Sequence, residues 1–410
     1  MSIACFFCGS PDQRLALSLG QQPLANSYLK LEQLEEQEPA YPLDLYFCGE
    51  CGLVHIEAVA TSHDIFSDYA YFSSYSTSWL EHARQYVDQV VDRLRLGPES
   101  YVLEIASNDG YLLQNFVERG IPCTGIEPAA NVAQASVEKG IDTLVAFWGA
   151  DTARALVSDR GQADLIIGNN VLAHVPAIND FLAGVRLALT AQGTVTMEFP
   201  HLLCLVEGTQ FDTIYHEHFS YFSLLVAQKM FAGHGMTVYD VEELPTHGGS
   251  LRIYARHAFD ESRPVTEAVL NLIAREQALG LNTLPYLEQF ARRVEHVRET
   301  LVAQLQALRA QGKRVAAYGA PAKGNTLLNF CGIGCDLIDY TVDRSPHKQG
   351  QFLPGSRIPI FAPELVEQDK PDYLLILPWN LREEIMGQMS HIRGWGAKFI
   401  VPIPEPHIFD

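Results

Sequence analysis

The sequence predicts an α/β protein with a small N-terminal zinc-knuckle domain followed by two Rossmann-like layers. Three observations lead to this fold class. Two CxxC pairs lie near the start, short apolar runs alternate with helical patterns from about 67 to 240, and a second such series follows 312. With 410 residues, the chain is also too long for one ordinary domain. We therefore expect three domains, at residues 1–66, 67–240 and 241–410.

The N-terminal cysteines form two matched pairs in turn contexts, Cys5-x2-Cys8 in "CFFCGS" and Cys48-x2-Cys51 in "CGECGL". Four thiolates at this spacing suit tetrahedral Zn²⁺, and because they close the coordination sphere the metal should be structural. A redox CxxC is the main alternative, but it predicts a single pair at the start of a helix. The remaining cysteines are expected to be core residues or incidental: Cys123, Cys204, Cys331 and Cys335.

The central region alternates apolar runs with helical patterns. Buried strands are expected at 101–106, 122–127, 163–170 and 193–199, and the intervening helices include 111–119 and 176–190. This alternation predicts βαβ units in a parallel, doubly wound sheet. Ligands of such sheets bind at the carboxyl ends of the strands.

The turn after the first of these strands is a candidate cofactor site. Glu104 lies near the strand end, the tight turn "SNDG" (107–110) leads into a helix, and Glu127 ends the next strand. An acidic residue after the second strand is well placed to bind ribose hydroxyls.

The same turn departs from GxGxxG, because Ala106 and Asn108 occupy its early glycine positions. This disfavours a dinucleotide, whose pyrophosphate needs close backbone approach at a helix N-terminus. S-adenosylmethionine has no phosphate and fits the turn better. Phe147 or Trp148, in "FWGADTA", is then expected beside the adenine.

The stretch 212–223, "DTIYHEHFSYFS", concentrates proton-handling side chains: Tyr215, His216, Glu217, His218 and Tyr221. A zincin HExxH motif is excluded because Ser220 stands four residues after His216. In an extended segment, His216 and His218 would share one face while Tyr215 and Glu217 share the other. A polar seam in a core is the plain alternative. His174 follows strand 163–170 at the expected ligand edge, which favours an acid–base centre.

The C-terminal region begins with "THGGSLRIYARH" and continues with a mostly helical stretch from about 262 to 311. Strands are expected in "RVAAYGA", "DLIDYTVD", "PDYLLILPW" and "AKFIVPIP". Together they predict the second Rossmann-like layer.

The charge balance excludes several partners. The chain has 29 Lys and Arg against 49 Asp and Glu, a formal net charge of −20. Such a field repels nucleic acid and anionic membranes, so a phosphorylated ligand would need a local basic pocket. The start "MSIACFFCGS" does not resemble a signal peptide, and no apolar run reaches the roughly 18–20 residues of a membrane span. We expect a cytoplasmic protein, and a monomer.

Further motifs follow the CxxC pairs in a fixed order: "YFSSYS", "EIASNDGY", "NNVLAHV", "EFPHL", "YHEHFSYFS", "THGGSLR" and "YGAPAKGNTLLN". Over essentially its whole length the chain thereby resembles the S-adenosylmethionine-dependent sugar C-methyltransferases, which act at C-3 of nucleotide-linked 4-keto-6-deoxyhexoses. The resemblance implies a zinc-knuckle domain, a methyltransferase domain and a C-terminal Rossmann-like domain. It places the sugar nucleotide, here expected to be TDP-linked, between the last two.

The resemblance also implies two sets of binding residues. The cofactor site would comprise Glu104, Ser107, Asn108, Gly110, Tyr111, Glu127, Phe147, Trp148 and Asn170. The substrate site would comprise Tyr221, His247, Ser250, Arg252, Lys323, Gly324, Asn325, Arg344 and Lys348. The segment "YGAPAKGN" is not a Walker A motif, because Asn325 stands where that motif needs Lys. Its turn can still hold a diphosphate through backbone amides and one cation.

Methylation of a carbon beside a ketone needs a base and a stabilised enolate. His218 is the first choice for the base and Tyr215 the second, with Glu217 orienting its neighbours. His174 and Tyr71 would donate to the enolate oxygen, although Tyr69 is an alternative to Tyr71.

Three other functions remain open at this point. O- or N-methylation of a sugar nucleotide needs no exchange of a C–H proton. NAD-dependent oxidoreduction is disfavoured by the missing GxGxxG and YxxxK motifs. A non-catalytic, zinc-stapled nucleotide-sugar-binding protein would bind the sugar without the cofactor.

Overall fold

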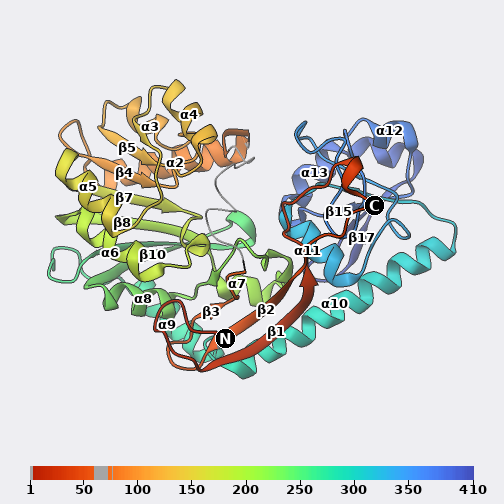
Figure 1. Cartoon of the computed structure of the whole chain (residues 1–410), viewed down its shortest axis with the longest axis horizontal. Helices are drawn as coiled ribbons and strands as arrows, with labels where there is room; N and C mark the ends of the chain where they lie inside the picture. The colour runs from red at the N-terminus through yellow and green to blue at the C-terminus, as the bar shows by residue number, and fades with distance from the viewer. Residues whose placement is uncertain (1–2, 60–72, 76) are drawn as a thin grey trace.

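The computed structural model describes residues 3–59, 73–75 and 77–410, which build three β-sheets with helices around them (Figure 1). A cysteine cluster lies in the N-terminal region, and two Rossmann-like sheets follow it. The mixed α/β fold class predicted from the sequence is confirmed.

The N-terminal sheet is antiparallel and has the order β1-β2-β3-β9. Its first three strands are β1 (Gln13–Gln22), β2 (Tyr41–Cys48) and β3 (Val54–His55). The fourth, β9 (Ser220–Tyr221), comes from the middle of the chain and begins two residues after His218, the last residue of the YHEH stretch (215–218). Val54 pairs with Tyr221, so the zinc-knuckle domain holds the chain where it leaves that stretch.

The central sheet has seven strands in the order β10-β11-β8-β7-β4-β5-β6. The strands are β4 (Val102–Ile105), β5 (Cys123–Ile126), β6 (Thr143–Leu144), β7 (Ala163–Asn169), β8 (Leu189–Pro200), β10 (Met236–Leu244) and β11 (Ser250–His257). Strands β4 to β8 are parallel, and the β10–β11 hairpin adds antiparallel strands beyond β8. Residue 240, where the second domain is expected to end, lies within β10.

The helices of this region are α2 (Thr77–Leu94), α3 (Gln114–Val117), α4 (Ala130–Glu138), α5 (Ala150–Arg160), α6 (Ile178–Ala188), α7 (Leu202–Glu207) and α8 (Leu224–Gly233). Helix α3 is shorter than the expected helix 111–119. Asn115 N–H donates to Leu112 O and Phe116 N–H to Leu113 O, so hydrogen bonds between residues three apart tighten the chain at the start of this short helix.

The C-terminal sheet has the order β14-β13-β12-β15-β16-β17, parallel except for β17. Its strands are β12 (Val315–Tyr318), β13 (Thr341–Val342), β14 (Ile360–Phe361), β15 (Tyr373–Ile376), β16 (Lys398–Val401) and β17 (His407–Phe409). The helices are α9 (Glu267–Leu279), α10 (Leu284–Ala310), α11 (Ala322–Cys331), α12 (Leu365–Asp369) and α13 (Arg382–Gln388). Among the described residues, no helix is both long and apolar enough to cross a bilayer.

The zinc-knuckle domain packs on both larger parts. Leu43 and Leu45 of β2 share a hydrophobic core with α10 and the C-terminal sheet, and α10 runs alongside β1 toward that sheet (Figure 1). Cys48 and Leu53 instead join the core of the seven-stranded sheet. The N-terminal domain therefore braces the junction at which the YHEH stretch lies.

Candidate active site

The four N-terminal cysteines converge on one point. Their Sγ atoms all lie within 4.8 Å of one another, with Cys5 to Cys51 and Cys8 to Cys48 both at 3.5 Å. Tetrahedral zinc with Zn–S bonds of about 2.3 Å would set its sulfurs about 3.8 Å apart. The Leu53 N–H also points to Cys51 Sγ, at 3.4 Å. The donor set fits a closed structural Zn²⁺ site.

The predicted cofactor turn is held by the Glu127 carboxylate. This carboxylate accepts the N–H of Asn108 at 3.0 Å and that of Ala129 at 2.9 Å. Asn108 Oδ1 accepts the N–H of Ser73 at 2.9 Å, which ties the chain before α2 to the turn. Ser107 is buried and its N–H donates to Ile126 O. Hydrogen bonds from the protein itself therefore hold the turn at the carboxyl edge of β4.

Glu104 is a buried carboxylate behind this turn. Neither of its oxygens has a hydrogen-bond partner among the described residues, and burial, with Glu127 and Asp109 nearby, raises its pKa well above the usual value. A buried carboxylate of this kind is costly unless a cation or donor meets it. The ammonium group of S-adenosylmethionine would do so. A buried carboxylate without a protein partner at this place therefore fits this cofactor.

The remaining cofactor candidates surround the same edge. Tyr111 is buried, with its ring 6.0 Å from that of Trp79. Trp148 Nε1 donates to Phe181 O on α6, whereas the Phe147 side chain is largely exposed. Asn170 adopts a left-handed φ of 53° after β7.

Gly110 has a φ of +75°, and a Cβ there would lie 2.3 Å from Ile141 Cδ1 and 2.7 Å from Ser136 Oγ. We expect Gly110→Ala to lower the free energy of unfolding by at least about 2 kcal/mol, because left-handed strain and a steric clash add together. It should also weaken S-adenosylmethionine binding. Urea unfolding and titration calorimetry measure the two effects.

Gly140→Ala is the matched control, because Gly140 has a φ of +80° but nothing within 4 Å of a new Cβ. It should show the cost of the left-handed backbone alone, about 1 kcal/mol, with cofactor affinity intact. Equal losses in the two variants would contradict the steric argument.

The YHEH stretch forms a turn rather than an extended segment. His218 N–H donates to Tyr215 O at 2.9 Å, which brings the first and fourth side chains together. Tyr215 Oη and His218 Nε2 lie 2.7 Å apart, and His218 Nδ1 is 2.9 Å from Thr213 O. Since a carbonyl only accepts, Nδ1 must carry the proton. His218 therefore presents an unprotonated Nε2 that accepts from Tyr215.

Two more histidines influence His218. The His174 ring lies 4.7 Å away, edge-on, and the charge of protonated His247 would also act on His218. Burial is the main cause that lowers the pKa of His218 well below its usual value and those of His174 and His247 to about 4. All three keep some accessible surface. Neutral imidazoles that are desolvated but accessible are expected where a protein faces a small-molecule substrate.

The other side chains of the stretch point elsewhere. Glu217 Oε1 accepts Asn26 Nδ2 at 2.6 Å, and burial raises the Glu217 pKa to about 6. His216 Nε2 contacts Pro42 O at 3.2 Å. Tyr221 is buried, with its ring 6.5 Å from that of His218. Tyr71 and its alternative Tyr69 lie outside the described residues.

The C-terminal candidates gather at the N-terminus of α11. Gly324 packs against Leu377, where a Cβ would lie 3.0 Å from that side chain. Asn325 Nδ2 donates to Ala25 O at 2.6 Å, and Lys348 Nζ donates to Ala320 O at 2.8 Å. Arg344 is exposed. The N-terminal domain thus reaches the loop in which the basic residues were expected.

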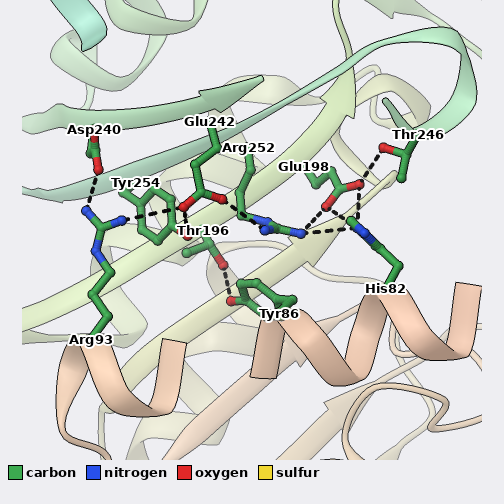
Figure 2. Close-up of polar contacts among 10 residues, drawn as sticks. All are labelled: His82, Tyr86, Arg93, Thr196, Glu198, Asp240, Glu242, Thr246, Arg252 and Tyr254. Carbon is green, nitrogen blue, oxygen red and sulfur yellow. Dashed lines mark hydrogen bonds and ion pairs between the residues drawn. The ribbon is translucent and has the colours of Figure 1, made fainter. Parts of the chain in front are cut away.

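Arg252 occupies a different place from the other basic candidates. Only 2% exposed, it donates to Glu198 at 2.6 Å and Glu242 at 3.0 Å and lies over the Tyr86 ring (Figure 2). Its contacts are those of a buried ion-pair network between α2 and the sheet. Ser250 is buried beside it on β11, and its Oγ donates to Thr246 O.

Sequence reasoning missed several polar residues of the site. Glu198 accepts from His82, Thr246 and Arg252, which holds α2 and the His247 loop on β8 (Figure 2). Glu198 lies in the "EFPHL" motif and Asp212 begins the stretch 212–223, so a sequence motif pointed to each of them. No motif pointed to their contact partners, which lie far away in the chain.

Comparison with known proteins gives three domain models. They are "Putative zinc binding domain" over residues 5–66, "Methyltransferase domain" over 79–241 and "C-methyltransferase C-terminal domain" over 245–404. The C-methyltransferase NovU of Streptomyces niveus is 38% identical over 404 residues, which covers 98% of this chain and 96% of NovU. The chain belongs to the C-methyltransferase family. As a C-methyltransferase, it depends on S-adenosylmethionine and carries a zinc-binding domain, as predicted.

Several solved structures are similar to about half of this C-methyltransferase. The magnesium protoporphyrin IX methyltransferase ChlM of Synechocystis PCC 6803 is 14% identical, with a TM-score of 0.33, and the match covers 48% of this chain and 98% of ChlM. The PH0226 protein of Pyrococcus horikoshii OT3 is also 14% identical, with a TM-score of 0.38. The match covers 48% of this chain and 97% of the PH0226 chain.

Proposed function

We propose that this C-methyltransferase transfers a methyl group from S-adenosylmethionine to C-3, beside the ketone of a TDP-linked 4-keto-6-deoxy sugar. The observation that supports it best is the unprotonated Nε2 of His218. Thr213 O fixes this tautomer by accepting from Nδ1, and Tyr215 and His174 lie on either side of the ring. A C–H bond becomes a nucleophile only after a base removes its proton, so C-methylation needs such a group.

In this proposal the Tyr215 hydroxyl, which donates to His218 Nε2 in this structure, turns away when the sugar binds, and His218 Nε2 takes the proton from the carbon beside the ketone. The C–H electron pair forms a C=C bond and the carbonyl oxygen takes the negative charge, to which His174 and Tyr71 donate. The enolate carbon then forms a bond to the methyl carbon while the sulfur–methyl bond breaks. Its electron pair stays on sulfur and the ketone is restored. The bound cofactor supplies the electrophilic methyl group.

Tyr215 is the second candidate for the base. Its hydroxyl donates to His218 Nε2, so it can take the substrate proton while it passes its own to His218. Glu217 contacts Asn26 instead of His218, so we propose that it shapes the sugar site from the N-terminal side. Lys348, Arg344, Gly324 and Asn325 are the proposed diphosphate neighbours at the N-terminus of α11.

The test combines proton NMR and mass spectrometry in deuterated water. The substrates are TDP-4-keto-6-deoxyglucose and its 3-deoxy and 3-amino relatives, with and without S-adenosylmethionine. We expect deuterium to enter beside the ketone and, with cofactor present, a methyl-sized mass gain. A methyl gain without exchange at that carbon would indicate O- or N-methylation instead.

The pH dependence of solvent exchange follows from the His218 pKa. The base must be neutral, and it is neutral above its pKa, which burial lowers from about 6.5. The exchange rate should therefore be flat from pH 8 down to 6.5 and fall only at lower pH. An exchange rate that already falls with decreasing pH at or above pH 7 would contradict His218 as the base. A fall in the rate near pH 6 that disappears in Glu217→Gln would identify Glu217, whose pKa is about 6, as the base.

A further inference from the structure

Asp212 places a carboxylate with no accessible surface at the junction of the methyltransferase and C-terminal domains. It belongs to η4 (Phe211–Thr213), directly before the Thr213 carbonyl that accepts from His218. Its Oδ2 accepts the indole N–H of Trp379 at 2.7 Å, while Oδ1 has no hydrogen-bond partner among the described residues. A carboxylate buried in this way needs a cation nearby.

Burial raises the pKa of Asp212 to about 6, and the positive charge of Lys323 opposes that shift. Lys323 Nζ lies 4.7 Å from the centre of the Trp379 ring and donates to Asn380 Oδ1. Burial lowers the Lys323 pKa, and the attraction of Asp212 opposes this shift. Trp379 therefore holds both charges, since its N–H binds the carboxylate and its face binds the ammonium.

Lys323 lies in the first turn of α11, and α11 packs against η4, whose Thr213 carbonyl accepts from His218. From this position the charge of Lys323 helps to lower the pKa of both His218 and His247. A substrate ketone within reach of His218 would lie in the same field. A fixed ammonium is best matched to a charge that develops during the reaction.

We propose that Lys323 stabilises the enolate oxygen and that Asp212, through Trp379, is the positioning residue that holds Lys323 there. The inference rests on the proposed enolisation. As His218 removes the C–H proton, the carbonyl oxygen gains the negative charge and accepts a hydrogen bond from Lys323 Nζ, which keeps its proton. When the carbon gains the methyl group, the charge leaves the oxygen and the C=O bond re-forms.

The test separates the exchange step from nucleotide binding. Solvent exchange is measured at saturating TDP-4-keto-6-deoxyglucose without S-adenosylmethionine, and TDP affinity by titration calorimetry. Lys323→Met should slow exchange by about a hundredfold and leave the Kd for TDP within about twofold. Asp212→Asn keeps an acceptor for Trp379 and removes only the charge, so it should slow exchange about tenfold. Lys398→Met, an exposed lysine paired with Asp410, should change neither.

If Lys323→Met keeps wild-type exchange at saturation and instead raises the Kd for TDP more than tenfold, Lys323 is a diphosphate ligand and the inference is wrong. Should Lys323→Met fail to fold, Trp379→Phe decides, because it keeps the ring and removes the N–H. It should slow exchange severalfold with TDP affinity unchanged, and wild-type exchange would overturn the role of Asp212. Failure of the proposed function is distinct, since the wild type itself would then show no exchange.

Discussion

Replacing His218 by Asn is expected to slow solvent exchange and methyl transfer by about a thousandfold, within the range that a general base contributes. An Asn amide can still donate to Thr213 O as Nδ1 does, but it has no unprotonated nitrogen in the place of Nε2. The turn should persist, because its backbone hydrogen bond from His218 N–H to Tyr215 O is independent of the side chain. Rates of deuterium uptake and of methylated product measure the loss.

His216→Asn is the matched control, two residues away in the same turn. His216 Nε2 contacts Pro42 O, away from Tyr215, so we expect this variant to lose some stability and to keep its turnover. Tyr215→Phe separates the two candidate bases. A loss as large as that of His218→Asn would assign the proton transfer to Tyr215 and His218 as a pair. Full turnover by His218→Asn would remove His218 from the base role.

Patterns local in the chain could be predicted from the sequence. The strands β4, β5, β7 and β8 follow from apolar runs between helical patterns, and the four cysteines follow from spacing alone. The YHEH stretch could not be predicted to this level. An extended segment would place His216 and His218 on one face, whereas the turn brings Tyr215 to His218 and sends His216 toward Pro42.

What the sequence could not show are contacts between distant residues. Arg252 carries a charge that suits a diphosphate, and only its pairing with Glu198 and Glu242 reveals that this charge is already balanced. Asn26 meets Glu217 across 191 positions and Trp379 meets Asp212 across 167. Burial raises the pKa of both Glu217 and Asp212 to about 6, and this burial depends on how the three domains pack. Local periodicity carries no information about that packing.

Loss of zinc should have the largest effect on stability. Cys48 is fully buried, and we expect Cys48→Ser to lose the bound metal and to lower the free energy of unfolding by about 3–5 kcal/mol, because a structural metal site contributes its binding energy to folding. Metal content by mass spectrometry and thermal unfolding measure the two losses. The exposed Cys335, whose Sγ contacts Arg357 O, is the matched control. Cys335→Ser should keep its zinc and unfold within about 0.5 kcal/mol of the wild type.

The same substitution should also affect the turn that carries the proposed base His218, although four thiolates would close the coordination sphere of the zinc. Cys51 is followed by β3, β3 pairs with β9, and β9 begins two residues after His218. Ile56 N–H further donates to Phe219 O, and Phe219 N–H to Ala173 O beside His174. Without the metal, we expect β3 to become mobile, and His218 and His174 to lose their fixed positions with it. Exchange in Cys48→Ser should therefore fall at temperatures where the central sheet is still folded. Wild-type exchange in a zinc-free, folded variant would show that the turn holds without the knuckle.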